Sequence, residues 1–138
     1  KPVDETTPVF RNFHISNVYC SGAEKGIFVR GVPEMHVQNI VLENMVLQAR
    51  KGIDVQEATN ITFRNIRLET ASTSPVVDVT QSDTLTFDKI ITKAGTELFF
   101  RFNGDRTKKI QLKNTDLNNA KEKTSFELGA SDKELQQF

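Results

Sequence analysis

The hydrophobic and polar positions of this chain follow one phrase that returns along its length, apolar–x–apolar–x–Asn–apolar–x–apolar. The full copies are FHISNVYC (13–20), IVLENMVL (40–47), ITFRNIRL (61–68) and IQLKNTDL (110–117). A fifth copy, LTFDKIIT (85–92), has Lys89 in the Asn position. The copies start 27, 21, 24 and 25 residues apart. Such a period is typical of solenoids, in which each coil buries its apolar face against its neighbours.

Each copy alternates apolar and polar residues, which is the period of a β-strand. We name the stretch before the Asn position strand a and the stretch after it strand b. A third stretch, strand c, follows after a loop of variable length: IFV (27–29), IDV (53–55), VDV (77–79), FRF (100–102) and FEL (126–128). No helical period lies between these stretches. The sequence therefore predicts an all-β fold, a parallel β-helix of about five coils with three short strands each.

The outward-facing residues test this alignment, because neighbouring coils should lie about 4.8 Å apart. The strand-a column is Ser16, Glu43, Arg64, Asp88 and Lys113. The strand-c column is Phe28, Asp54, Asp78, Arg101 and Glu127. From Glu43 onward each strand-a residue meets an opposite charge, which contributes roughly 0.2–1 kcal/mol per pair. Strand c has one like-charged step, Asp54 beside Asp78.

The Asn position predicts a structural ladder at the corner between strands a and b. Its members are Asn17, Asn44, Asn65 and Asn114. A side-chain amide both donates and accepts hydrogen bonds, so stacked, inward-facing copies can satisfy one another and the turn backbone. The alternative is a set of unrelated turn asparagines. At Lys89 either the corner opens or the ammonium reaches out to solvent. A second, shorter column of turn residues precedes strand a: Asn12, Asn39 and Asn60.

The two ends of the chain differ in pattern from the coils. Residues 1–8, KPVDETTP, are polar with two prolines and predict a lead-in or linker, while residues 9–138 predict the β-helix domain. The tail SDKELQQF has two interpretations. Ser131 and Glu134 fit a capping box that would open a helix. Leu135 follows Ile110 by 25 residues, which favours another strand a, and we prefer the strand.

The composition of the chain indicates which classes of partner and cofactor are not expected. The 138 residues fit one domain and carry no formal net charge, so the basic face of a nucleic-acid-binding protein is not expected. No apolar run approaches the roughly 18 residues that suggest a membrane span. The single Cys20 falls in an inward strand-b position and is interpreted as a core residue rather than a reactive thiol. His14 and His36 lie far apart in the repeat and no metal-ligand spacing is seen, so we expect neither a metal nor another cofactor.

One pair of carboxylates has the residue types that catalysis would need. Asp54 and Asp78 are the only carboxylates stacked in one outward column, and glycoside hydrolysis uses two carboxylates, one as acid and one as base. The alternative is a solvated strand face on which Arg101 neutralises one of the two, and we favour it.

A resemblance to a known family covers nearly the whole chain. Residues 7–68, TPVFRNFHISNVYCSGAEKGIFVRGVPEMHVQNIVLENMVLQARKGIDVQEATNITFRNIRL, resemble the C-terminal coils of polygalacturonase-like enzymes of glycoside hydrolase family 28, of the Bacteroidetes type. The segment PEMHVQNIVLENMVLQARKGID is the most distinctive, and the likeness continues more weakly through NGDRTKKIQLKNTDL. It implies a right-handed parallel β-helix, a periplasmic or extracellular location, and hydrolysis of galacturonide linkages in pectin with inversion.

The family's catalytic motifs are largely missing. They are Asn-Thr-Asp, Asp-Asp, Gly-His-Gly and Arg-Ile-Lys, and this chain lacks the last three. Its single Asn-Thr-Asp is a false match, since Asn114 belongs to the corner ladder and Asp116 is expected to point outward from strand b. We therefore expect no catalytic residue in this chain and no activity alone. The resemblance places the substrate cleft on the strand-c face, where Arg30 and His36 are candidates to reach a carboxylated sugar.

The sequence thus supports two functions. The first is the C-terminal β-helix portion of a pectin-degrading hydrolase, which meets pectic polysaccharide or oligogalacturonide through the parent enzyme. The second is a non-catalytic β-helix that binds glycans or associates with itself. Because the first coil begins abruptly with Phe10, Phe13 and Ile15, we expect its end to be covered by residues 1–9 or by end-to-end association, and we favour association.

Overall fold

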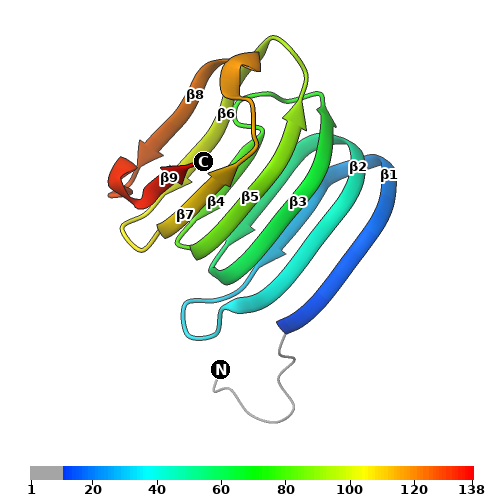
Figure 1. The fold of residues 1–138 in the computed structure, drawn as a ribbon. Coiled ribbons are helices and arrows are strands. Elements are labelled where there is room, and N and C mark those ends of the chain that lie inside the picture. The colour runs from blue at the N-terminus through cyan, green and yellow to red at the C-terminus, as the bar shows by residue number, and fades with distance from the viewer. Residues whose placement is uncertain (1–10) are drawn as a thin grey trace.

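The computed structural model describes residues 11–138, which form a parallel β-solenoid of about five turns (Figure 1). The strands are β1 (Arg11–Arg30), β2 (Val37–Gln56), β3 (Ala58–Thr70), β4 (Val77–Thr80), β5 (Asp83–Thr92), β6 (Thr96–Asn103), β7 (Lys108–Lys113), β8 (Ala120–Glu127) and β9 (Leu135–Gln137). They belong to one sheet in which each strand pairs in parallel with the strand one coil away. The predicted all-β parallel β-helix is confirmed. The predicted lead-in, residues 1–8, lies outside the described residues.

The strands are longer than the sequence predicted, because they continue through the corners. β1 and β2 each contain strands a, b and c in 20 residues, and β3 and β5 contain strands a and b. Each corner between strands a and b is a single residue in the left-handed region, with φ of 59° at Asn17, 57° at Asn44 and 54° at Asn65. One such residue redirects the chain while the neighbours on both sides remain paired to the next coil. Asparagine tolerates this conformation better than most residues, which explains its place in the repeat.

The corner asparagines face solvent, whereas the sequence placed them on the inward face. All of Asn17, Asn44, Asn65 and Asn114 are exposed. A left-handed residue breaks the strand alternation, so its side chain leaves the inward face. The column still carries hydrogen bonds, with Asn65 Nδ2 donating to Asn44 Oδ1 at 2.9 Å and Asn114 Nδ2 donating to Asp88 Oδ1 at 3.0 Å. Lys89 takes the same conformation, φ 58°, and its side chain is exposed.

The shorter column before strand a is also a hydrogen-bonded ladder of left-handed residues. Asn60 Nδ2 donates to Asn39 Oδ1 at 2.8 Å, and Asn39 Nδ2 donates to Asn12 Oδ1 at 3.2 Å. Thr84 and Lys109 continue the column with φ of 57° and 54°. We name these five residues the entry column, because each one precedes a strand a.

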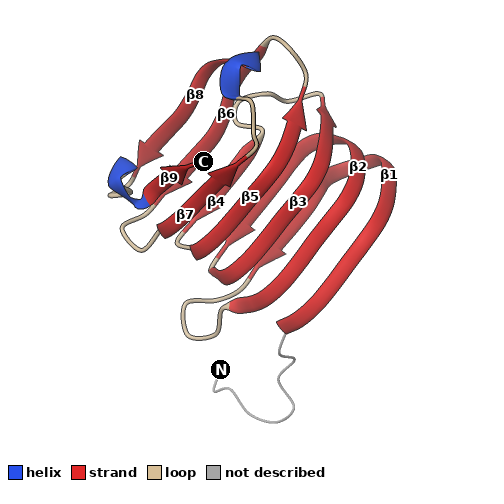
Figure 2. Ribbon diagram, in the orientation of Figure 1, coloured by secondary structure: helices blue, strands red, loops and turns tan. Residues whose placement is uncertain are grey.

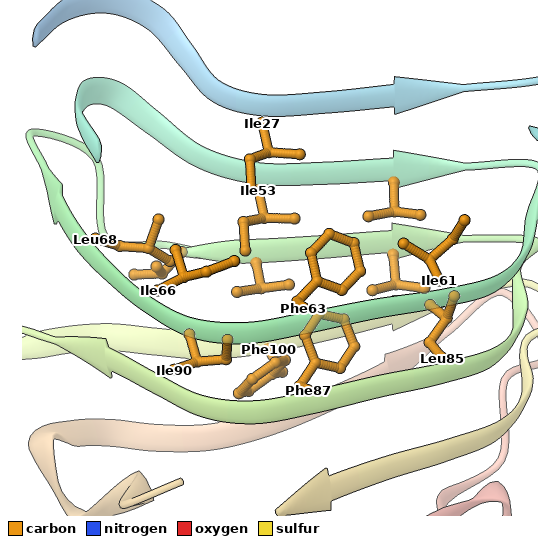
Figure 3. Packing of buried hydrophobic residues seen from close by; sticks show 14 of the residues in the cluster. Ile27, Ile53, Ile61, Phe63, Ile66, Leu68, Leu85, Phe87, Ile90 and Phe100 are labelled. Atoms are coloured by element: carbon orange, nitrogen blue, oxygen red, sulfur yellow. The ribbon is translucent and has the colours of Figure 1, made fainter. Parts of the chain in front are cut away.

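Inward-facing residues stack in columns and form one core along the solenoid. Phe63 lies flat on Phe87 with ring centroids 4.8 Å apart, and Phe87 meets the edge of Phe100 at 5.2 Å (Figure 3). Ile27 and Ile53 occupy one column on successive coils. Phe63, Phe87 and Phe100 are fully buried. Dispersion contacts and removal of apolar surface from water therefore hold each coil to the next.

The outward columns test the register of the coils. On strand a the pairing is as predicted throughout: Ser16, Glu43, Arg64, Asp88 and Lys113 lie side by side. Arg64 lies between two carboxylates, 3.4 Å from Glu43 and 3.7 Å from Asp88. On strand c the last step is wrong, because Arg101 pairs with Ser125 and not with Glu127. Phe126 therefore follows Phe102 in its column, and strand c of the last coil begins two residues earlier than predicted.

The C-terminal end carries both short helices, η1 (Leu117–Asn119) and η2 (Asp132–Glu134) (Figure 2). The preferred strand interpretation of the tail is confirmed, since Leu135 pairs with Ile110. Ser131 nevertheless caps a helical turn, accepting a hydrogen bond from the Lys133 N–H. Asp116 caps η1 and accepts from the Asn118 N–H, so it does not lie on a strand b as predicted.

Candidate functional site

The outward face of strand c, on β1, β2, β4 and β6, holds the carboxylates singled out above. Asp54 accepts a hydrogen bond from Lys25 Nζ at 2.7 Å and another from Gln56 Nε2 at 3.1 Å. Asp78 accepts two hydrogen bonds from Arg101, one from Nε at 3.2 Å and one from NH2 at 2.8 Å. Asn103 Nδ2 also donates to Asp78, at 2.8 Å.

The two carboxylates are thus each bound to a cation of their own. The sequence assigned Arg101 to one of the two carboxylates, and the structure shows that this carboxylate is Asp78 and that Lys25 is the partner of Asp54. Asp54 and Asp78 are paired residues on adjacent coils, which lie about 4.8 Å apart. An inverting pair needs roughly 6.5–9.5 Å between its carboxyl groups to admit a water. This arrangement therefore favours a structural role over acid–base catalysis.

The electrostatics of the face agree with this role. The hydrogen bonds that Arg101 donates to Asp78 raise the pKa of Arg101 above its ordinary value. The negative charge of Asp78 acts in the same direction, and partial burial of Arg101 opposes it. Glu127 and Asp54 add weaker attraction to the same guanidinium. The cation is therefore fixed between carboxylates from neighbouring coils.

At the β1 end of this face the surface becomes aromatic and basic. Phe28 is half exposed, and Lys25 Nζ lies 4.0 Å from the centre of its ring. Arg30, at the end of β1, is exposed. An aromatic ring beside cations is a surface that can pack against a sugar ring and hold its polar groups.

His36, the second candidate for sugar contact, is instead tied to the next coil. Its Nδ1 lies 2.8 Å from Thr59 Oγ1, and its Nε2 lies 3.0 Å from Glu57 Oε2. The Nε2 contact is close enough for an ion pair but lacks hydrogen-bond geometry, so Oε2 is buried without a hydrogen bond among residues 11–138. Arg106 NH2 reaches the other oxygen of Glu57 at 3.2 Å. A ligand would have to displace these partners to reach the imidazole, which makes Arg30 the better candidate.

Over residues 11–138 the end of the solenoid at β1 is open. A hollow of about 660 Å³ there is lined by residues of β1 and β2, most of which face inward: Phe13, Ile15, Val18, Cys20, Gly26, Ile27, Phe28, Val29, Arg30, Val37, Ile40, Leu42, Met45 and Leu47. Phe13 and Ile15 are 46% and 44% exposed. Within residues 11–138, β1 pairs only with β2. The first described coil therefore presents a strand edge and the apolar interior of the solenoid.

No three His, Cys, Asp or Glu side chains of residues 11–138 lie together as a metal ion would require. The part of the chain that the structure describes has no helix long and apolar enough to cross a membrane. Cys20 is a free thiol, half-buried and packed against the core.

Comparison with known proteins adds no further constraint. No protein family, no curated protein and no solved structure matches this chain.

Sequence reasoning missed two features of the site. Lys25 lies outside the repeated phrase, so nothing in the pattern assigned it to Asp54. The polar column Thr86, Gln111 and Gln136 on strand a was also missed. Its signal was present, because these residues follow one another by 25 positions, the spacing that aligned the last coils.

Proposed function

We propose that this chain is a β-helix portion of a secreted, pectin-degrading glycoside hydrolase and that it is inactive alone. The open end at β1 carries the proposal. Among residues 11–138 this end exposes Ile15 and a strand edge with no partner strand, so it is suited to receive another coil. In this proposal the catalytic carboxylates belong to coils stacked on β1, outside residues 11–138.

The strand-c face supports the choice of substrate. It carries the half-exposed ring of Phe28 and an exposed Arg30, which suit a polyhydroxylated ligand with carboxylates. Asp54 and Asp78 are held by cations and contribute to the scaffold. The substrate would therefore contact this part of the protein without being cleaved there.

Activity assays test the proposal in two arms. The 138-residue chain should release no reducing ends from polygalacturonate. The natural gene product that contains these residues should release them with inversion at the anomeric carbon, as followed by proton NMR. Activity of the chain alone that is lost on Asp54→Asn would refute its inactivity. An inactive natural product would refute the hydrolase assignment.

The role of Arg30 is tested in the same natural product. Arg30→Ala should raise KM for oligogalacturonides several-fold with little change in kcat, because a contact remote from the reacting bond contributes to binding alone. Arg50→Ala, at an exposed arginine with only a distant partner at 3.9 Å, is the matched control. Unchanged kinetics in Arg30→Ala would remove this residue from the substrate-binding face.

The same open end also supports a second candidate, a non-catalytic β-helix that associates with itself. Two copies that meet at β1 would bury Phe13 and Ile15 and pair their strand edges. Sedimentation equilibrium distinguishes the candidates. Under the second, the natural gene product dimerises and Ile15→Lys makes it monomeric, whereas under the first it is monomeric throughout.

A further inference from the structure

A second hollow lies on the outward face of strand a, near the C-terminal end. It measures about 310 Å³ and is lined by Thr84, Leu85, Thr86, Lys109, Gln111, Lys133, Glu134 and Gln136. Its floor is the polar column in which Thr86 pairs with Gln111 and Gln111 with Gln136. Thr84 and Lys109 of the entry column form one side. Lys133 and Glu134 of η2 form another.

The charges of this hollow are unbalanced. Neither Lys109 nor Lys133 makes an ion pair with any of residues 11–138. Glu134 is the one acid of the lining, and its Oε1 accepts a hydrogen bond from the Lys109 backbone N–H at 3.2 Å. Asp83, beside Thr84, is also occupied, accepting from the Thr59 and Thr84 hydroxyls at 3.1 and 2.9 Å. Two ammonium groups are therefore available to a ligand.

The floor determines which anion fits. Thr86, Gln111 and Gln136 present hydroxyl and amide groups that both donate and accept, repeated about every 4.8 Å along the solenoid. Such a row suits a linear chain of hydroxyl-bearing rings. The matching chemistry is a chain of sugars that carries carboxylates.

We propose that this hollow binds an acidic oligosaccharide, its carboxylates against Lys109 and Lys133 and its hydroxyls on the Thr86–Gln111–Gln136 column. It lies on strand a, not on the strand-c face, and so goes beyond the function proposed above. It would hold a neighbouring stretch of polysaccharide without cleaving it. All residues of the site belong to the chain described here, so binding at this site can be tested whether or not the hydrolase proposal is correct.

The test is a titration of the ¹⁵N-labelled 138-residue chain with trigalacturonate, followed by NMR. The amide signals of Thr86, Gln111 and Gln136 should shift together and saturate, and binding should weaken with added salt. The double variant Lys109→Asn, Lys133→Gln should bind about tenfold more weakly, the size expected for two exposed charge pairs. Asparagine is chosen at position 109 because it tolerates the left-handed backbone there.

Matched controls separate this site from general charge effects. Lys89→Asn changes an exposed lysine of the same left-handed conformation outside the hollow, and Lys93→Gln changes another exposed lysine. Both should bind as the unaltered chain does. Galactotriose, which lacks carboxylates, should bind more weakly than trigalacturonate. The proposal would be overturned if the control variants lost as much affinity for trigalacturonate as the double variant. It would also be overturned if galactotriose or a short oligonucleotide bound as tightly as trigalacturonate, or if the amide shifts were confined to residues outside the hollow.

Discussion

The two ends of the solenoid are built differently although they share one repeat. At the β1 end, Phe13 and Ile15 of strand a are nearly half exposed. At the other end the corresponding strand, β9, is preceded by η2, and Leu135 packs partly buried against the core. A second turn, η1, buries Leu117 where strand b would have continued.

The difference shows that the repeat specifies a coil but not its termination. A coil that follows the phrase fully, as β1 does, presents a strand edge and an apolar interior to the next coil. The last coil departs from the strand pattern: in its copy, IQLKNTDL, Thr115 stands where the other copies have an apolar residue, and Asp116 and Ser131 cap helical turns instead of extending strands. Departures from the repeat therefore mark a closed end, and adherence to it marks an end that accepts a neighbour.

The largest expected effect comes from making the same substitution in two coils, one at the β1 end and one in the centre of the solenoid. Ile15 and Ile61 both face inward on strand a, but Ile61 is fully buried while Ile15 is 44% exposed. Ile61→Ala should lower the free energy of unfolding by about 2–5 kcal/mol, because it removes buried methylenes and leaves a cavity. Ile15→Ala should lower it by less than about 1 kcal/mol. Urea denaturation measures both, and equal losses would show that the β1 end is as well covered as the centre.

A smaller effect is expected at the corners. Asn65 and Asn17 share the left-handed conformation, but only Asn65 has a ladder bond, to Asn44. Asn65→Ala should destabilise by about 2 kcal/mol, from the backbone preference and the lost hydrogen bond together. Asn17→Ala should destabilise by about 1 kcal/mol, from the backbone preference alone.

The glycine variants separate the two contributions. Asn65→Gly keeps the backbone conformation accessible and should lose only the ladder bond. If Asn65→Ala and Asn17→Ala destabilise equally, the ladder bond contributes nothing measurable.

The period and the strand alternation were enough to predict the coils, the strand-a register and the last strand. They failed where a single backbone residue matters more than side-chain pattern. The left-handed corners turned the side chains of Asn44 and Asn65 outward. In the last coil, which lacks strand b, Arg101 pairs with Ser125, two residues before the position that the sequence predicted. The ion pair of Lys25 with Asp54 was not predicted, because Lys25 pairs in register with Lys51 and its side chain reaches Asp54 diagonally on the next coil.

The smallest effect concerns a contact between the first two coils. The hydrogen bond from His14, with weaker help from the charges of His14 and Arg64 and against some desolvation, lowers the pKa of Glu43 below its ordinary value. Since the folded state then favours the ionised carboxylate, this contribution to stability is present above the ordinary pKa. It is lost as the pH falls through the lowered one.

Carbon-13 NMR titration of the Glu43 carboxyl checks this contact. In His14→Ala the pKa should move back up towards its ordinary value. His36→Ala, which removes a histidine bound to Glu57 instead, should leave it in place. A Glu43 pKa that does not respond to His14→Ala would show that the first coil is not held to the second by this contact.

The most direct test of the open end is residue-resolved hydrogen exchange along β1, compared between the 138-residue chain at low concentration and the natural gene product. β1 amides that point away from β2 should exchange rapidly in the chain alone, while those of β3 and β5 exchange slowly. In the natural product the same β1 amides should become protected to a similar degree as those of β3, because a further coil pairs with them. Rapid exchange at these amides in both proteins would contradict the account.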